Sequence, residues 1–203
     1  EDAANILKQI AKSGRKILFV ATKKQAKSIV ADAAKSLNMP YITERWPGGL
    51  LTNFSTIRKS VKKMDGIDKM KADGTFDTLS KRERLQIDRT REKLELNFGS
   101  IVNMTRMPEA IFVVDINKEH VAIAESRKLG IRSFAVVDTN TNPTLIDYPI
   151  PANDDASKSI KCIVDVITKA ISEGLEERNS KMEEKAKEKE KKAKEIVEKE
   201  TTK

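Results

Sequence analysis

Apolar residues along this chain follow two spacings, one typical of buried strands and one typical of amphipathic helices. Short continuous apolar runs at 16–21, 110–115 and 133–138 have the length and composition of parallel strands buried on both faces. Residues 23–37 and 118–129 instead place apolar side chains every three or four positions, which predicts helices. Because strands and helices alternate, the fold class predicted is α/β: a three-layer, Rossmann-like (doubly wound) domain with a mainly parallel sheet.

Weaker signals complete this domain. A helical stripe opens the chain at residues 3–11, a short strand is expected at 41–43, and a turn-rich segment precedes another strand at 146–150. The last helix of the domain carries apolar residues at 160, 164, 167 and 171, and either Asp154 or Asp155 is expected to cap its amino end.

The pattern changes between residues 54 and 105, which form the predicted arm. Two stretches with helical spacing are separated by the turn Asp73-Gly74-Thr75, and charged residues flank a narrow apolar seam. This pattern predicts an inserted antiparallel α-helical coiled-coil hairpin. Residues 1–53 and 106–175 are then the two parts of the α/β domain, and residues 176–203 are a charged Lys/Glu tail, either helical or disordered.

Residues 45–54, Arg-Trp-Pro-Gly-Gly-Leu-Leu-Thr-Asn-Phe, connect the domain to the arm. Pro47 fixes its own φ and biases Trp46 away from helix, while the two glycines allow a positive φ or a close backbone approach. Thr52 or Asn53 is expected to cap the helix that follows. The segment therefore predicts a contact-making hinge, in which Trp46 either stacks on a base or packs beneath the arm.

The formal net charge of +8 is unevenly distributed. Residues 57–106 hold 13 Lys and Arg against 8 Asp and Glu, residues 1–39 hold 8 against 3, and residues 107–175 hold 7 against 10. A basic excess in the front of the domain and in the arm favours a polyanionic partner, although high Lys content also serves solubility alone. The residues predicted to bind RNA are Lys23, Lys24, Arg45, Trp46, Gly48, Gly49, Arg58, Lys59, Lys62 and Lys63.

Signals for enzyme chemistry are sparse, and no catalytic residue is predicted. Neither a Gly-x-Gly-x-x-Gly nor a Walker-type phosphate loop is present. The single histidine, His120, is expected at a helix terminus, and the single cysteine, Cys162, is expected to be a small buried hydrophobe. Asp115 and Asp138 each follow an apolar strand, so they could share a structural divalent cation, Mg²⁺ or Zn²⁺, or could cap the next loop or helix. No cofactor is otherwise required.

Other features concern the setting of the chain. No apolar run approaches the roughly 20 residues of a membrane span, no signal peptide opens the chain, and one cysteine excludes an internal disulfide. A soluble, cytoplasmic protein is expected. Because Glu1 is not Met and a helical stripe begins at once, the chain is expected to begin inside a larger protein.

Several blocks up to about Gly174 resemble the small-subunit ribosomal protein two family in its bacterial form. Residues 45–54 resemble its Arg-Trp-x-Gly-Gly-x-Leu-Thr-Asn box, and Asp73-Gly74-Thr75-Phe76 resembles the tip of its helical hairpin. Val137-Asp138-Thr139-Asn140 is similar to its Val-Asp-Thr-Asn box, and Pro151 to Ala156 is similar to Ile-Pro-Gly-Asn-Asp-Ala with Ala152 in the glycine position. The family's opening segment, with a His-Phe-Gly-His box, has no counterpart before Glu1.

The resemblance implies a non-catalytic, structural constituent of the small ribosomal subunit in the cytoplasm. Its implied partners are 16S-type small-subunit rRNA, neighbouring small-subunit ribosomal proteins and ribosomal protein one, with no membrane and no homo-oligomer. Two other classes stay open from the residues alone. One is a divalent-metal-dependent doubly wound enzyme or ligand-binding domain built on Asp115 and Asp138, and the other is a protein-docking scaffold whose arm binds a partner helix.

Overall fold

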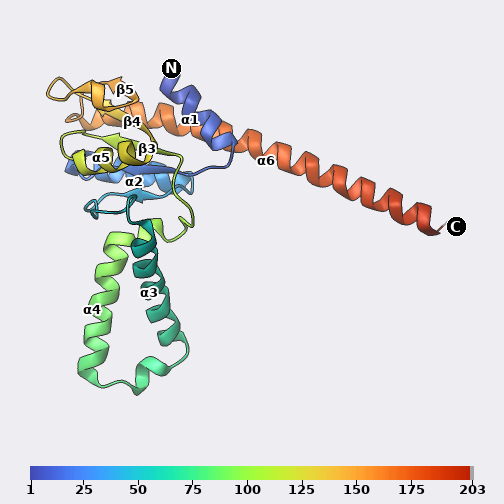
Figure 1. The fold of residues 1–203 in the computed structure, drawn as a ribbon, viewed down its shortest axis with the longest axis horizontal. Helices are drawn as coiled ribbons and strands as arrows, with labels where there is room; N and C mark the ends of the chain where they lie inside the picture. The colour runs from blue at the N-terminus through green and yellow to red at the C-terminus, as the bar shows by residue number, and fades with distance from the viewer. Residues whose placement is uncertain (202–203) are drawn as a thin grey trace.

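The computed structural model describes the backbone of residues 1–201 and the side-chain surroundings of residues 1–182. Its centre is a five-stranded, fully parallel sheet with strand order β2-β1-β3-β4-β5 (Figure 1). The strands are β1 (Ile17–Val20), β2 (Tyr41–Ile42), β3 (Ala110–Val114), β4 (Arg132–Val137) and β5 (Tyr148–Pro151). The predicted α/β, doubly wound fold class is confirmed.

Aromatic side chains lie in register across the middle of the sheet. Phe19 pairs with Phe112, and Phe112 pairs with Phe134. The rings of Phe19 and Phe112 meet edge to face with centroids 5.5 Å apart, while Phe134 stacks on Tyr148 at 4.6 Å. Such pairs stabilise the sheet beyond the area they bury, and they fix its register.

Helices cover both faces of the sheet, which gives the three layers. The apolar cluster on one face includes side chains from α1 (Asp2–Lys12), α2 (Lys24–Ser36) and α6 (Ser157–Thr201). The cluster on the other face combines α5 (His120–Leu129) with the segment from Trp46 to Leu51. The hinge segment is therefore part of the second core.

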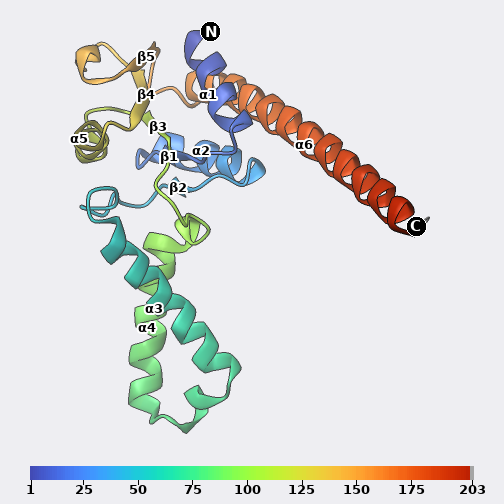
Figure 2. The ribbon, with the colours of Figure 1, turned by 45° about the vertical axis from the view of Figure 1, so that its right-hand side comes forward.

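Helix α6 continues unbroken past the boundary predicted at residue 176 and extends away from the sheet (Figure 2). Around Gly174 the helix packs closely on α1: glycine leaves room for the carbonyl oxygen of Lys8, which would lie 2.5 Å from an added Cβ. Lys8 Nζ contacts Glu173 at 2.8 Å and Glu177 at 3.1 Å. Hydrogen bonds from Lys12 and Lys8 lower the pKa of Glu177 to about 2. The first two residues of the predicted tail thus lie beside α1.

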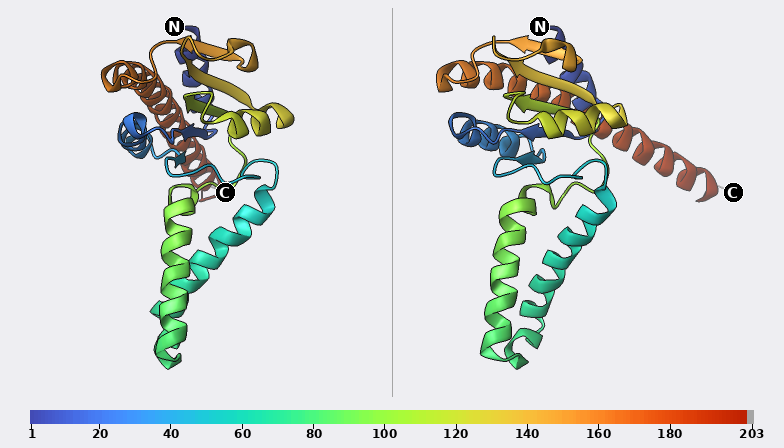
Figure 3. Two further views of the ribbon diagram at one scale, coloured as in Figure 1. Left: turned by 90° about the vertical axis from the view of Figure 1, so that its left-hand side faces the viewer. Right: turned by 60° about the vertical axis from the view of Figure 1, so that its left-hand side comes forward.

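The arm consists of α3 (Phe54–Ala72) and α4 (Lys81–Phe98), and it projects from the side of the sheet that carries β2 (Figure 3). Gly74, with φ of 73°, makes the turn at the tip together with a short 3-10 helix, η1 (Thr75–Thr78). Helix α3 buries four apolar residues and α4 buries none, so the shared seam is shallow. Two ion pairs, Asp68 with Arg91 and Lys71 with Asp88, join the helices across it. Coiled-coil packing of the arm stays a prediction.

The base of the arm is fixed to the sheet by polar contacts. Arg58 Nη1 donates to the carbonyl oxygens of Val102 (3.1 Å) and Met104 (3.3 Å). A second 3-10 helix, η2 (Gly99–Ile101), places the Ser100 hydroxyl where it donates to the Tyr41 carbonyl on the outer edge of β2. The third, η3 (Pro143–Leu145), leads into β5. The arm is therefore rigidly positioned at its root.

Candidate functional site

The carboxyl ends of β1 and β3 lie side by side, where the strand order reverses direction. In doubly wound folds this is the place where ligands bind, in a crevice outside the strand ends. Thr22 and Lys23 follow β1, while Asp115 and Glu119 follow β3. The chemistry of this crevice decides whether the fold can serve as a nucleotide-binding enzyme.

Glu119 occupies the position where such enzymes bind a phosphate. Its Oε1 accepts hydrogen bonds from Thr22 N at 2.9 Å and Thr22 Oγ1 at 2.5 Å, directly before the amino end of α2. Helix amino ends attract anions, and here the anion is the chain's own carboxylate. Burial raises the pKa of Glu119, an effect that the hydrogen bonds from Thr22 oppose. The crevice is thus filled from within.

Lys23 connects the carboxylates that surround the same crevice. Its Nζ lies 2.7 Å from Asp154 Oδ1, 2.6 Å from Asp155 Oδ1 and 3.4 Å from Asp115 Oδ2. The Lys23 side chain is 12% exposed and that of Asp154 is 1% exposed. Burial lowers the pKa of Lys23, but hydrogen bonds to Asp154 and Asp155 outweigh it and raise the pKa above its ordinary value. Lys23 therefore keeps its charge at neutral pH.

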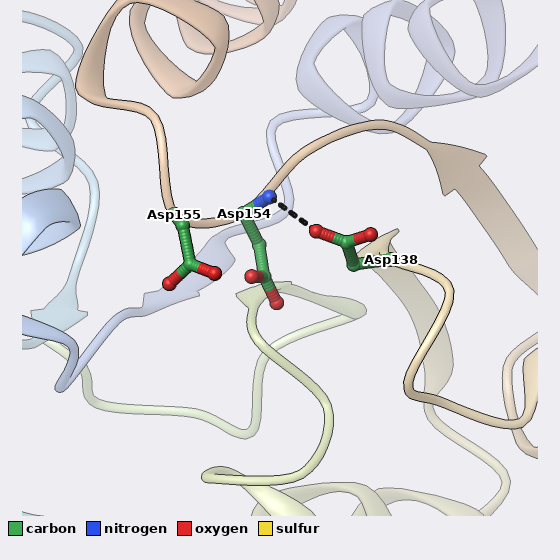
Figure 4. Close-up of side chains that lie close together, drawn as sticks. All are labelled: Asp138, Asp154 and Asp155. Carbon is green, nitrogen blue, oxygen red and sulfur yellow. Dashed lines mark hydrogen bonds between the residues drawn. The ribbon is translucent and has the colours of Figure 1, made fainter.

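Asp115 and Asp138, the predicted metal ligands, have separate surroundings. Asp115 adopts a positive φ of 72° and accepts a hydrogen bond from Lys118 N at 3.1 Å. This bond caps the loop after β3, which is the second of the two roles considered for Asp115 from the sequence. Asp138 accepts from Thr139 N at 2.6 Å and from Asp154 N at 3.3 Å, and these hydrogen bonds lower its pKa. Carboxylate oxygens of Asp138, Asp154 and Asp155 lie within 4.8 Å of one another (Figure 4). Asp115 is outside this donor set.

The cap expected from Asp154 or Asp155 is wrong. Asn153 Oδ1 accepts from Asp155 N at 2.8 Å and from Ala156 N at 2.9 Å, just before α6 begins. The Asp154 carboxylate turns instead toward Lys23, because an ion pair in a buried position outweighs one capping bond. Within the part of the chain that the structure describes, Asp154 Oδ2 is buried and has no hydrogen-bond partner.

A second polar centre lies under the hinge segment and is formed by Glu125 of α5. Its Oε1 accepts from Trp46 Nε1 (3.0 Å) and Gly49 N (2.7 Å). Its Oε2 accepts from Leu51 N (3.0 Å) and from both N and Oγ1 of Thr52 (3.1 Å each). Burial alone would raise the pKa of Glu125, but these hydrogen bonds outweigh it and lower the pKa. We call these five residues the Glu125 cradle.

The Glu125 cradle explains the hinge sequence. Trp46 is 8% exposed, so it packs under the arm rather than presenting a free ring. The side-chain cap expected from Thr52 or Asn53 is wrong: Asn53 makes no such bond, and the Thr52 hydroxyl serves Glu125. Glu125 is not among the predicted site residues, although it lies in a stretch, from Pro108 to Ile131, that is similar to a signature of the family that the sequence resembles. Its local signal is an acidic residue on the face of a helix whose neighbours Ala122, Ile123 and Ser126 are buried.

Gly49 and Gly48 offer a matched test of the cradle. Gly49 has φ of 84°, and an added Cβ would lie 3.2 Å from Asn53 Cβ, whereas nothing lies within 4 Å of a Cβ on Gly48. We expect Gly49→Ala to reduce the free energy of unfolding by about 1–2 kcal/mol, and Gly48→Ala to change it by less than about 0.5 kcal/mol. Urea unfolding monitored by Trp46 fluorescence measures both. Equal effects would contradict the assigned geometry.

The predicted RNA-binding residues fall into two groups. Lys23, Trp46 and Arg58 are held by internal partners, and Gly49 donates to Glu125. The others are exposed, and within the described side chains none of the cations among them forms an ion pair: Lys24, Arg45, Gly48, Lys59, Lys62 and Lys63.

The single histidine lies where the sequence predicts it, whereas the single cysteine does not. His120 begins α5, and its Nδ1 lies 3.1 Å from the Asn117 carbonyl oxygen, as expected of a helix-terminus residue. The prediction that Cys162 is buried is wrong, because its side chain is exposed. The buried stripe of α6 runs through Ile160, Val164, Ile167 and Ile171, and Cys162 lies on the opposite side of the helix.

Fold and site together define a doubly wound α/β protein in which the chain's own side chains occupy the crevice at the strand ends, and exposed cations without an ion-pair partner among the described side chains lie on the hinge and on α3. The sequence model for ribosomal protein S2 matches residues 1–174. The chain therefore belongs to the ribosomal protein S2 family, whose members are structural components of the small ribosomal subunit.

Relatives support this assignment. The chain is 67% identical over 183 residues to the small ribosomal subunit protein uS2 of Flavobacterium johnsoniae, covering 90% of this chain and 72% of the relative. It is 62% identical over 180 residues to that of Parabacteroides distasonis, covering 89% and 65%. The protein of the same name from Porphyromonas gingivalis is 63% identical, with 89% and 64% covered. No helix among the described residues is long and apolar enough to cross a membrane.

Proposed function

We propose that the chain binds small-subunit rRNA of the 16S type and acts as a structural constituent of the ribosome in the cytoplasm. The observation that carries this proposal is the row of exposed cations on α3, Lys59, Lys62 and Lys63, which form no ion pair within the described side chains. Free cations of this kind bind phosphate with release of counterions. Family membership supports the same conclusion.

The mode of binding follows from the rigidity of the arm. Glu125 holds the hinge through five hydrogen bonds, and Arg58 fixes the root of α3, so the lysines are presented on a fixed helix. Lysine ammonium groups contact phosphate oxygens without reading base edges. The arm therefore recognises the shape of folded RNA rather than its sequence.

Replacing Lys59, Lys62 and Lys63 by Gln tests the role of the arm. Because Lys62 and Lys63 point in different directions, only one of them is expected to contact the RNA, so the triple variant should lose two phosphate contacts. The slope of log affinity against log salt should flatten by roughly 1.4 to 1.8. Fluorescence anisotropy with labelled small-subunit rRNA measures it. The control replaces Lys158, Lys161 and Lys169, which are exposed on α6, and it removes the same charge. Equal slopes for both variants would refute the arm as the RNA surface.

We further propose that the neighbours of the chain are other small-subunit ribosomal proteins and that it helps to dock ribosomal protein one. Family membership supports this role. Depleting the chain from cells should yield small subunits that have lost ribosomal protein one while their other proteins are retained. Normal amounts of ribosomal protein one on depleted subunits would exclude the docking role.

We also propose that the carboxylates around Lys23 hold a structural divalent cation. Asp115, Asp154 and Asp155 contact one ammonium group, and Asp138 lies beside the last two, so negative charge is in excess; within the described residues, Asp154 Oδ2 is buried without a partner. An all-oxygen donor set suits Mg²⁺ better than Zn²⁺.

The cation proposal predicts a metal-dependent shift in thermal unfolding. Adding Mg²⁺ should raise the melting temperature of the unmodified chain, and Asp138→Asn should abolish the increase. Asp165→Asn, an exposed substitution on α6, should leave it intact. An equal increase in all three proteins would indicate general ionic stabilisation and would contradict a site at Asp138.

A further inference from the structure

A basic pocket lies at the opposite edge of the sheet from the Lys23 cluster. It encloses about 410 Å³ and is lined by Gly14, Arg15, Lys16, Asn103, Thr105, Arg106 and Met107. Residues 14–16 lead into β1, and residues 103–107 lead from the arm into β3. The pocket therefore forms where the arm returns to the sheet, at the amino ends of two central strands.

Positive charge converges on this pocket from three segments. Arg15 and Lys16 come from the loop before β1, Arg106 comes from the loop before β3, and Arg178 of α6 lies over Gly14. An added Cβ on Gly14 would lie 2.6 Å from Arg178 Cζ, and Gly14 also has a positive φ of 78°. The positive φ favours glycine at this position, and the absence of a Cβ leaves room for the guanidinium.

The nearby negative charge does not balance these cations. Glu109 accepts from Arg15 Nη1 and, at 2.8 Å, from Arg132 Nη2, so it serves two arginines. Lys16 Nζ donates to the Asn38 carbonyl at 2.6 Å and meets no carboxylate within the described side chains. Burial, together with the charge of Arg178, lowers the pKa of Lys16. Like charges held together in this way are stabilised when an anion binds between them.

We propose that this pocket is a second RNA-binding site, which takes a backbone phosphate and the adjoining nucleotide. Guanidinium forks bind phosphate in a bidentate manner, and Asn and Thr side chains are common partners of phosphate and ribose. The pocket volume falls within the range of small-molecule sites, so one nucleotide fits. Met107, 40% exposed at the rim, offers an apolar contact for a base or sugar. The inference rests on the proposed rRNA binding, but it assigns residues outside the hinge and α3.

The double variant Arg15→Gln/Arg106→Gln tests the pocket in the full chain. Both side chains are exposed, so the fold should be retained, which circular dichroism and thermal unfolding will check. With labelled small-subunit rRNA, the slope of log affinity against log salt should flatten by roughly 1.4 to 1.8, and affinity at moderate salt should fall about 10-fold. Lys158→Gln/Lys161→Gln on α6 removes equal charge and should change neither.

The outcomes separate this inference from the proposed function. If the pocket variant matches the α6 control while the α3 lysine variant weakens RNA binding, the inference is wrong and the proposed function stands. If the unmodified chain binds no RNA, both fail. Thermal shifts with inorganic pyrophosphate, and retention on a poly-glutamate column, complete the test. A pocket-dependent response to either probe without a change in RNA affinity would mark a small-anion or acidic-peptide site and overturn the inference.

Discussion

Replacing Glu125 by Gln will lower the free energy of unfolding by about 3–5 kcal/mol at neutral pH. The carboxylate accepts hydrogen bonds from Trp46 Nε1, Gly49 N, Leu51 N and Thr52. A Gln amide would place an N–H group against some of these donors and leave them without an acceptor. Chemical unfolding with Trp46 emission as probe measures the loss, and the emission should also shift to the red as the ring becomes hydrated. Glu92→Gln, an exposed substitution on α4, should change stability by less than about 0.5 kcal/mol.

The difference in unfolding free energy between the unmodified chain and Glu125→Gln should depend on pH through the pKa of Glu125. Because the folded-state pKa lies below the ordinary value of about 4.3, the carboxylate contributes stability that is present above that pH. The contribution is lost as the pH falls through the folded pKa. The stability difference between the unmodified chain and Glu125→Gln should therefore shrink below about pH 4. A difference that stays constant from pH 7 to pH 3 would contradict the Glu125 cradle.

Replacing Lys23 by Met will also cost about 3–5 kcal/mol, because it leaves buried carboxylates without their cation. Asp154 is 1% exposed at the side chain, and Asp115 is 12% exposed. Unfolding at pH 7 should show the loss, while Lys24→Met, whose side chain is exposed, should remain close to the unmodified chain.

Acid should partly rescue the Lys23→Met variant. Without the ammonium group, the clustered carboxylates resist ionisation, so the folded state takes up protons more readily than the unfolded chain. The difference from the unmodified chain should shrink as the pH falls toward 4. If Lys23→Met instead matches Lys24→Met at pH 7, Lys23 is a solvated surface residue and the account of the crevice is wrong.

The sequence predicted the sheet well because its strands are marked locally. The apolar runs at 16–21 and 110–115 contain β1 and β3, the run at 133–138 covers β4 apart from its first residue, Arg132, and the turn at Gly74 lies where the arm reverses. Parallel strands buried on both faces can be recognised from their own continuous apolar runs, without knowing which strands they pair with. The strand expected at 146–150 is observed at Tyr148–Pro151, after a 3-10 helix that the pattern does not distinguish from a turn.

The functional centres were harder to predict because their partners are distant in sequence. Glu125 binds donors 73 to 79 residues away, and Glu119 binds Thr22 across 97 residues. An acidic residue on a helix usually indicates a solvated face, so nothing local separates these two from ordinary surface glutamates. Lys23 was predicted to bind phosphate, and in the structure its ammonium group instead contacts the carboxylates of Asp115, Asp154 and Asp155.

The burial of a residue was predicted wrongly where it depends on the residue's position around its helix. Cys162 was expected in the core, yet it lies two residues after Ile160, about 200° around the helix from the buried stripe. The basic pocket at Arg15 and Arg106 was visible only as a general excess of charge in two separate segments. The sheet brings these segments together, because β1 and β3 are neighbours.

The most direct test of rRNA binding is sedimentation of the tagged chain from the cells that make it. Extracts are run on sucrose gradients at about 0.1 and 0.5 M salt, with and without ribonuclease, because higher salt removes weakly held surface contacts. A structural ribosomal protein will migrate with small subunits at both salt concentrations and will leave that position after ribonuclease treatment. A slowly sedimenting peak that ribonuclease does not change would contradict the proposal that this chain functions by binding small-subunit rRNA.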